Sequence, residues 1–154
     1  MITNTKAYIA QMRKHQQTIL NAASRVVNAT IIDMFSKIVD RTPVGNPSLW
    51  SYPAPTGYNP GTLKASWAID YNTNGAIRNE KGQFASFSGI GNAGGVKFTV
   101  TGNYRQDAII YNTQPYAQRV ETGWSTQAPQ GMMRITIKEY ESILNKNILR
   151  YRIK

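Results

Sequence analysis

The fold is decided by residues 5–43, TKAYIAQMRKHQQTILNAASRVVNATIIDMFSKIVDRTP. Apolar side chains recur there at spacings of three and four, which is typical of one apolar stripe along an α-helix. The stripe consists of Met12, Ile19, Ala23, Val26, Val27, Thr30, Ile31, Met34, Phe35 and Ile38. Thr3 or Asn4 is a suitable N-cap. Pro43 ends the pattern because it lacks an amide hydrogen and disfavours helix in the preceding residue. The pattern therefore predicts a helix over about residues 5–41.

Such a helix would be about 55 Å long. This length exceeds the width expected of a domain of 154 residues. We therefore expect the N-terminal part of the helix to project from the domain or to pack on a neighbour. The sole histidine, His15, lies on this part among basic residues, and we interpret it as a surface or packing residue.

Residues 42–62, which follow the helix, contain five prolines and form a predicted loop. The loop also carries large side chains that a solvated linker would avoid, and we name Trp50, Tyr52 and Tyr58 as candidate interface residues. Two interpretations stay open, since these aromatic residues could cover the core or contact another protein.

The middle of the chain, residues 63–112, predicts an antiparallel sheet of short strands. Apolar and polar residues alternate from Leu63 to Tyr71 and from Val96 to Thr101, and a shorter strand is expected over Ala108–Tyr111. Residues 75–95 form an inserted arm, which fits either a protruding β-hairpin or a mobile loop. The candidate interface residues of the arm are Lys81, Phe84 and Phe87.

A corner at residues 115–128 joins the sheet to the last helix, which is expected over about residues 129–150. Its structural residues are Tyr116, Glu121, Gly123 and Pro129. We expect the Glu121 carboxylate to accept hydrogen bonds from backbone amides or to pair with a base such as Arg119 or Arg134. Gly123 permits a turn, and Pro129 suits a first helical position. Trp124 is the candidate interface residue here. Met133, Ile135 and Ile137 fit a short strand as well as the start of the helix.

These segments together predict a single α+β domain over residues 1–154. Its small antiparallel sheet of three or four strands packs against a long N-terminal helix and a C-terminal helix. A long loop rich in proline and aromatic residues and a protruding hairpin or loop complete it.

The charge balance favours an anionic partner, since 18 Lys and Arg residues stand against 8 Asp and Glu residues, with a net charge of +10. The basic C-terminus, with Arg150 and Arg152, is a candidate interface, although a solvated tail is the simpler interpretation. We expect no membrane partner, because no apolar run approaches about 20 residues. We also expect no signal peptide, since the N-terminus lacks an apolar run followed by a cleavage site.

The residues needed for catalysis do not occur in recognisable patterns. Cysteine is absent, the eight carboxylates show no paired motif, and the glycines at 89–95 lack the lysine of a phosphate-binding loop. A metal site would need several histidines, cysteines or clustered carboxylates. We therefore expect no enzyme activity, no catalytic residue, no metal and no cofactor.

Two stretches of the chain resemble a known family. RTPV at 41–44 followed by GTLKASW at 61–67 is similar to the Thr-Pro-Val and Gly-x-Leu signature of tailed-bacteriophage neck and tail-completion proteins, the gp-ten-like head–tail joining family. Tyr116-Ala117, Val120-Glu121, Gly123 and Ala128-Pro129 resemble the segment before the last helix of that family. Residues 45–60 depart from it, because they separate motifs that lie close together in the family.

The resemblance implies a non-catalytic virion protein that assembles into a homo-oligomeric ring at the neck or the top of the tail. The expected partners are connector, terminator and other neck or tail proteins around the DNA channel. The expected localisation is the virion, and the host cytoplasm during assembly. A stand-alone basic DNA-binding protein is the alternative, since basic and aromatic residues could contact phosphates and bases.

Overall fold

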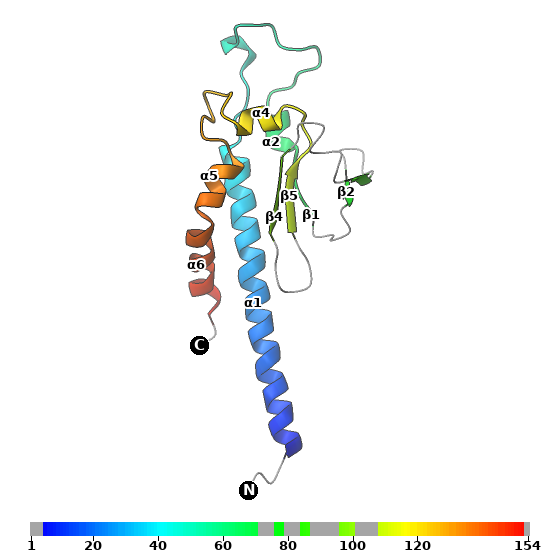
Figure 1. Ribbon diagram of the computed structural model, residues 1–154, viewed down its shortest axis with the longest axis vertical. Coiled ribbons are helices and arrows are strands. Elements are labelled where there is room, and N and C mark those ends of the chain that lie inside the picture. The colour runs from blue at the N-terminus through cyan, green and yellow to red at the C-terminus, as the bar shows by residue number, and fades with distance from the viewer. Residues whose placement is uncertain (1–4, 71–75, 79–83, 87–95, 101–107, 153–154) are drawn as a thin grey trace.

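The computed structural model describes residues 5–70, 76–78, 84–86, 96–100 and 108–152. Helix α1, Thr5–Arg41, has 37 residues and runs along the long axis of the molecule (Figure 1). Thr42 ends it, because its amide donates to the carbonyl of Val39 and its hydroxyl to that of Ile38. The prediction of a long helix that stops before Pro43 is confirmed.

The strands pair in two antiparallel groups. Strand β5, Ala108–Asn112, lies between β1, Trp67–Asp70, and β4, Val96–Val100. Separately, β2, Ala76–Arg78, pairs with β3, Phe84–Ser86. Strand β5 is buried along its whole length, as expected of the central strand of a sheet.

Within the described residues, five further helices lie between or after these elements, and the last three follow the sheet. They are the 3₁₀-helix η1 (Pro47–Leu49), α2 (Thr62–Ala65), α4 (Ala117–Glu121), α5 (Met133–Lys138) and α6 (Tyr140–Tyr151). In Figure 1, α5 and α6 lie along one side of α1, and the sheet lies on the other. The predicted mixture of helices with a small antiparallel sheet, a long N-terminal helix and C-terminal helices is confirmed.

The predicted strand over Leu63–Tyr71 is wrong in its first half, which forms α2. The Thr62 hydroxyl donates to the carbonyl of Asn59 at 2.7 Å, and the Ser66 hydroxyl donates to the carbonyl of Thr62 at 2.8 Å. These local hydrogen bonds favour a helical turn. Leu63 and Trp67 therefore do not share one strand, although both side chains are buried in the core.

The C-terminal helix differs from the prediction in two ways. It begins at Met133, so Pro129 lies in a turn before it and does not occupy the first helical position. It is also divided, because Glu139 has non-helical dihedral angles between α5 and α6. The strand interpretation of Met133, Ile135 and Ile137 is wrong, because these residues are helical.

One apolar core joins all the layers. Met34 and Ile38 from α1 contribute to the same cluster as Trp67 from β1, Ile110 from β5 and Ile143 from α6. Each of these side chains is buried. The core therefore surrounds the C-terminal half of α1, and the other half of the helix lies beyond it (Figure 1).

A polar cluster joins the end of α1 to the break between α5 and α6. The Lys37 ammonium lies 2.8 Å from one carboxylate oxygen of Glu139, and the Arg41 guanidinium lies 2.7 Å from the other. Arg41 also donates to the hydroxyl of Thr136 at 2.8 Å. The hydrogen bonds from Lys37 and then Arg41 hold the pKa of Glu139 below its ordinary value, because they stabilise the charged carboxylate.

The pairing of β2 with β3 supports the hairpin interpretation of the predicted arm at residues 75–95. Phe84 begins β3. Lys81 and Phe87 lie outside the described residues, so their predicted roles in an interface stay predictions.

Candidate functional site

A surface cavity of about 510 Å³ lies between the proline-rich loop and α4. We call it the aromatic pocket. Its lining includes Pro43, Gly45, Leu49, Trp50, Pro55, Tyr58, Leu63, Tyr116, Val120 and Trp124. In Figure 1 the loop rises above α2 and α4 at the end of the molecule opposite the N-terminus.

The loop places Trp50 and Tyr58 against one another. Asn46 caps η1, because its side-chain oxygen accepts from the amide of Ser48 at 3.1 Å and from its hydroxyl at 2.6 Å. The amide of Trp50 then donates to the carbonyl of Pro47. The rings of Trp50 and Tyr58 lie 4.8 Å apart at 60°, which is a favourable tilted arrangement of aromatic rings.

Gly45 makes this aromatic contact sterically feasible. A Cβ atom at this position would lie 2.1 Å from the hydroxyl oxygen of Tyr58 and 3.0 Å from the Trp50 ring. Any larger residue would displace one of the two rings. The glycine at position 45 can be read from the sequence, but only the fold shows that the Tyr58 hydroxyl lies close to it.

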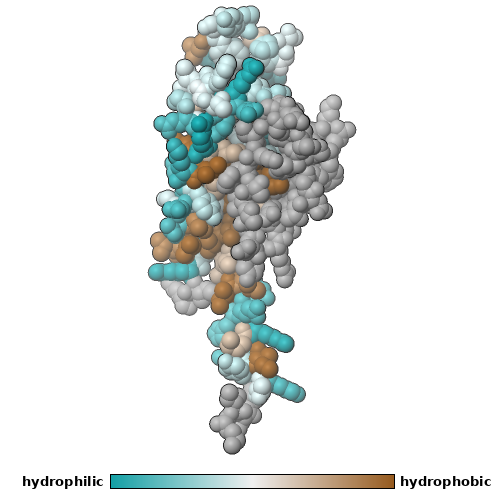
Figure 2. All heavy atoms as spheres, viewed as in Figure 1, coloured by the Kyte–Doolittle hydropathy of each residue, from teal (hydrophilic) through white to brown (hydrophobic). Residues whose placement is uncertain are grey.

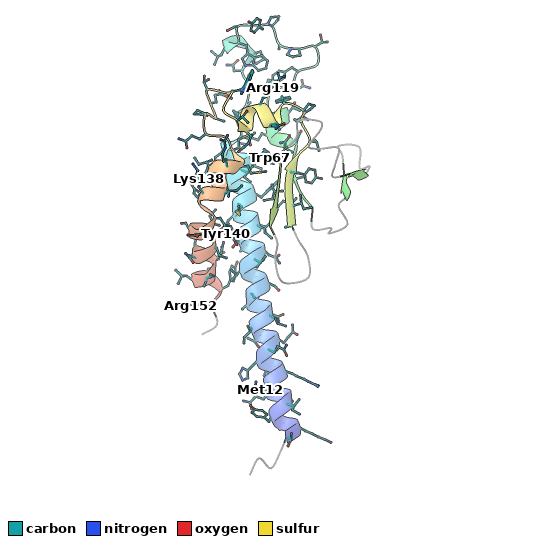
Figure 3. The ribbon with its side chains drawn as sticks, in the orientation of Figure 1. Met12, Trp67, Arg119, Lys138, Tyr140 and Arg152 are labelled. Carbon is teal, nitrogen blue, oxygen red and sulfur yellow. The ribbon has the colours of Figure 1, made fainter. Side chains whose placement is uncertain are left out.

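The opposite wall comes from α4 and the turn that follows it. Trp124 is 78% exposed. The Arg119 guanidinium lies over its ring, 5.6 Å from the centroid, which is within the range of a cation–π interaction. Gly123, with φ of +94°, forms the turn between them, as predicted. Arg119, labelled in Figure 3, thus supplies a positive charge beside an exposed aromatic surface.

Glu121 holds this wall to the rest of the domain. Its carboxylate accepts hydrogen bonds from the amides of Met132, Met133 and Arg134 at 2.8, 2.9 and 2.8 Å. These amides belong to the first turn of α5, which has no internal partners for them. The Arg134 side chain donates to the carbonyl of Glu121 and lies 3.8 Å from its carboxylate. The prediction that Glu121 accepts hydrogen bonds from backbone amides or pairs with a base such as Arg134 is confirmed, since both contacts occur.

The chemistry of the aromatic pocket suits an apolar partner. None of its described lining residues carries a carboxylate, amine, guanidinium or imidazole group. A largely apolar concave site with a few hydroxyl and amide groups binds by excluding water. Aromatic side chains with large exposed areas are also those that contribute most at protein interfaces.

The fold brings together some of the predicted interface residues and separates others. Trp50, Tyr58 and Trp124 meet in the aromatic pocket, and Tyr116 joins them. Tyr52, 81% exposed, belongs to the same loop but not to the lining. Arg152 follows α6, and Figure 3 shows it far from Arg119.

Two contributors to this region were not predicted. Arg119 was considered only as a partner of Glu121, whereas its guanidinium lies over Trp124. Buried Asn112 donates to the carbonyl of Leu63 at 2.8 Å and accepts from the amide of Gln114, so it supports the base of the pocket. No local pattern could have identified the contact of Asn112 with Leu63, because the two residues lie 49 positions apart in the sequence.

Two further observations concern the described residues as a whole. They contain no group of three or more His, Cys, Asp or Glu side chains arranged to hold a metal ion. No helix within them combines the length and the apolar character needed to cross a membrane.

Comparison with known proteins found no match to this chain among protein-family models, curated proteins or solved structures.

Proposed function

We propose that the chain is a structural subunit of a tailed-bacteriophage virion. It forms a homo-oligomeric ring at the head–tail junction or at the top of the tail. The ring joins the connector or terminator to the tail around the DNA channel, and the chain has no enzymatic role. It resides in the host cytoplasm during assembly and in the virion neck or tail afterwards.

The observation that carries this proposal is the meeting of the two stretches that resemble the neck and tail-completion family. The indole nitrogen of Trp67 donates to the buried hydroxyl of Thr42 at 2.7 Å. Leu63 belongs to one core cluster with Ala117 and Ala128, although these residues lie far apart in the sequence. The family-like residues therefore serve to bring two distant segments together, as expected of a scaffold that presents surfaces to its neighbours.

A closed ring also requires two different surfaces on each subunit, because its contacts are heterologous. The aromatic pocket and the exposed Trp124 supply one such surface. Ile148 and Leu149 on α6, 44% and 65% exposed, supply another, and Arg150 and Arg152 lie beside them. The loop and the C-terminal end of α6 are at different ends of the folded domain (Figure 1).

The proposal includes the finer architecture expected from the sequence. In it, one sheet of three or four strands and the helices on α1 form a single unit. The inserted loop at residues 45–60 and the β2–β3 arm then reach neighbouring subunits or partner proteins.

Mutation of exposed aromatic residues, Trp124 in the pocket and Tyr52 on the loop beside it, tests the proposed role. The purified chain is examined alone and with connector, terminator and tail proteins of a tailed phage, and ring formation is followed by electron microscopy and mass photometry. We expect Trp124→Ala and Tyr52→Ala to impair ring formation without lowering thermal stability, because both side chains are largely exposed. Ile32→Ala, at an apolar residue of α1 that is 53% exposed, is the matched control.

The rival function predicts different results. The net charge of +10 favours nucleic acid as a partner. Tight, salt-sensitive DNA binding by a monomer, with no incorporation into rings or particles, would overturn the structural role.

A further inference from the structure

The proline-rich loop carries a short exposed segment beside the aromatic pocket. We call residues 51–54, Ser-Tyr-Pro-Ala, the loop tip. Tyr52 is 81% exposed, and only Ala54 of the four residues is partly buried. The rings of Trp50 and Tyr58, on either side of the tip, lie 4.8 Å apart and close its base. In Figure 1 the loop extends beyond α2 and α4, so the tip is accessible to another molecule.

Proline restricts the loop tip to an extended conformation. Pro53 fixes its own φ, and Tyr52 and Ala54 each precede a proline, which disfavours helical dihedral angles for them. Residues 53–55 accordingly belong to no helix or strand. Within the described part of the chain, residues 51–54 make no hydrogen bond. An extended segment of this kind loses little conformational entropy on binding and presents its carbonyl groups to a partner.

The aromatic pocket has the chemistry that recognises such a segment. Extended segments that contain proline bind in grooves lined by aromatic side chains. Trp50, Tyr58 and Trp124 line this pocket, and its volume of about 510 Å³ is typical of a binding site. Asn46 and Gln127 also line it. Their side-chain amides are able to donate hydrogen bonds to the carbonyl groups of an extended segment.

Charge favours a second copy of this chain as the source of that segment. The chain has a net charge of +10, so two copies repel one another where their basic residues face each other. Residues 42–63 contain no Asp, Glu, Lys or Arg, and neither do residues 122–133. These two stretches supply the tip and most of the pocket lining. In Figure 2 the upper end of the molecule is mostly pale, and strongly hydrophilic residues lie mainly below it. Two like-charged copies can therefore approach closely here.

The same composition argues against other occupants. Nucleic acids and anionic lipids bind through several basic groups at the contact. The lining contains no lysine or arginine, and Arg119 beside Trp124 is a single charge. An acidic peptide would lack ion-pair partners in the lining for the same reason. An uncharged segment with proline and tyrosine fits this site, and the chain itself carries one.

We propose that the aromatic pocket binds the loop tip of a second copy of this chain. Tyr52 and Pro53 of one copy pack against Tyr58 and Trp124 of the next. The tip and the pocket are different surfaces, so the contact is heterologous, as a closed ring requires. This inference rests on the proposed function, since it names one contact between neighbouring subunits of that ring.

A peptide of the loop tip tests the pocket. The probe is a fluorescent, end-blocked peptide of residues 51–55, Ser-Tyr-Pro-Ala-Pro. Its binding to the full-length chain is measured by fluorescence anisotropy. We expect saturable binding that Trp124→Ala weakens about tenfold or more, because the pocket loses one aromatic wall. A peptide with serine in place of tyrosine and glycine in place of both prolines should bind about tenfold more weakly or worse. Ile32→Ala, at an exposed residue of α1, is the matched control and should bind as the parent does.

Cross-linking tests the contact between whole chains. The sequence has no cysteine, so an introduced pair reports a single contact. Ser51→Cys marks the tip, Thr126→Cys marks the pocket, and a mixture of the two variants is oxidised mildly. We expect a disulfide-linked dimer of the two variants, because the contact brings their cysteines within bonding reach. The yield should fall about tenfold when Ser142→Cys, at an exposed residue of α6, replaces Thr126→Cys. Adding Tyr52→Ala to the Ser51→Cys chain should lower it similarly.

Several results would overturn the proposal. Absence of peptide binding, or equal binding by Trp124→Ala, would remove the pocket as the receptor. Much tighter binding of a peptide with glutamate in place of serine would assign the pocket to an acidic segment of another protein. Equal cross-linking with Ser142→Cys would show that the chains meet at random.

Electron microscopy separates this contact from the virion role. Rings of normal size and yield from Tyr52→Ala chains would overturn the contact and leave the virion role standing. If the peptide binds and the chains cross-link, but neither rings nor particles incorporate the chain, the contact stands and the virion role fails.

Discussion

At the scale of single residues, Glu121 connects the end of α4 to the start of α5. Its carboxylate accepts from three backbone amides that have no helical partner. We expect Glu121→Ala to lower the free energy of unfolding by about 2–3 kcal/mol, since hydrogen bonds to a charged group are lost. Urea denaturation measures this loss. Glu141→Ala, at an exposed carboxylate in the first turn of α6, should change it by no more than about 0.5 kcal/mol. Equal losses would show that Glu121 does not act as a cap.

Gly131 is also constrained by Glu121, which lies close to its backbone. Its φ is +79°, and a Cβ atom would lie 2.5 Å from the carbonyl oxygen of Glu121. We expect Gly131→Ala to lower the free energy of unfolding by about 2–4 kcal/mol, because backbone strain and a steric clash add together.

Gly57→Ala is the control for Gly131→Ala. Gly57 has a similar φ of +81°, but nothing lies within 4 Å of its added Cβ atom. Its cost should therefore be only the backbone term, about 1 kcal/mol. Thermal or urea unfolding measures both losses. If Gly57→Ala and Gly131→Ala lower the free energy of unfolding by the same amount, the close approach of Glu121 to Gly131 adds nothing to the cost of Gly131→Ala.

At the scale of elements, the two halves of α1 should respond differently to the same substitution. Met34 is 0% exposed in the core, and Met12 is 52% exposed on the projecting half. We expect Met34→Ala to lower the free energy of unfolding by about 2–4 kcal/mol, since it removes buried atoms and leaves a cavity. Met12→Ala should change it by no more than about 0.5 kcal/mol. A large loss for Met12→Ala would show that the chain covers this face itself.

The junction of α1 with α5 and α6 should depend on pH. The pKa of Glu139 is lowered from its ordinary value of 4.5, chiefly by hydrogen bonds from Lys37 and Arg41. A carboxyl group whose folded pKa is depressed adds stability above its unfolded pKa, and this stability is lost as pH falls through the folded pKa. We therefore expect the Tm difference between the parent chain and Glu139→Gln to be constant near neutral pH and to shrink below about pH 4.5.

A second background tests the cause of this pH dependence. When Lys37→Gln and Arg41→Gln are both present, the carboxylate has lost the two cations that it contacts. Glu139→Gln should then no longer produce the pH-dependent Tm difference. If the difference persists, another group is responsible for it.

At the scale of the whole molecule, the projecting half of α1 should dominate the shape in solution. A compact domain of this length has a radius of gyration of about 15 Å. We expect small-angle X-ray scattering of the monomer at low concentration to give a clearly larger value, because α1 alone spans about 55 Å. A value near that of a compact domain would mean that the N-terminal half folds back onto the core.

Local patterns in the sequence determined the long helix, the loop that follows it, most of the strands and the turn at Gly123. Each depends on neighbouring residues alone: the periodicity of apolar side chains, the missing amide of Pro43 and the freedom of glycine. The expectation that Glu121 binds amides or pairs with a nearby arginine also came from the sequence, because no catalytic base, metal-ligand cluster or nucleophile accompanied it.

Tertiary structure decided what these patterns left open. The start of α5 depends on Glu121, which is eleven residues before Met132. The aromatic pocket exists only because the loop carrying Tyr58 packs beside the turn carrying Trp124. Contacts between distant segments arise from packing around one core, so the local periodicity of the sequence cannot predict them.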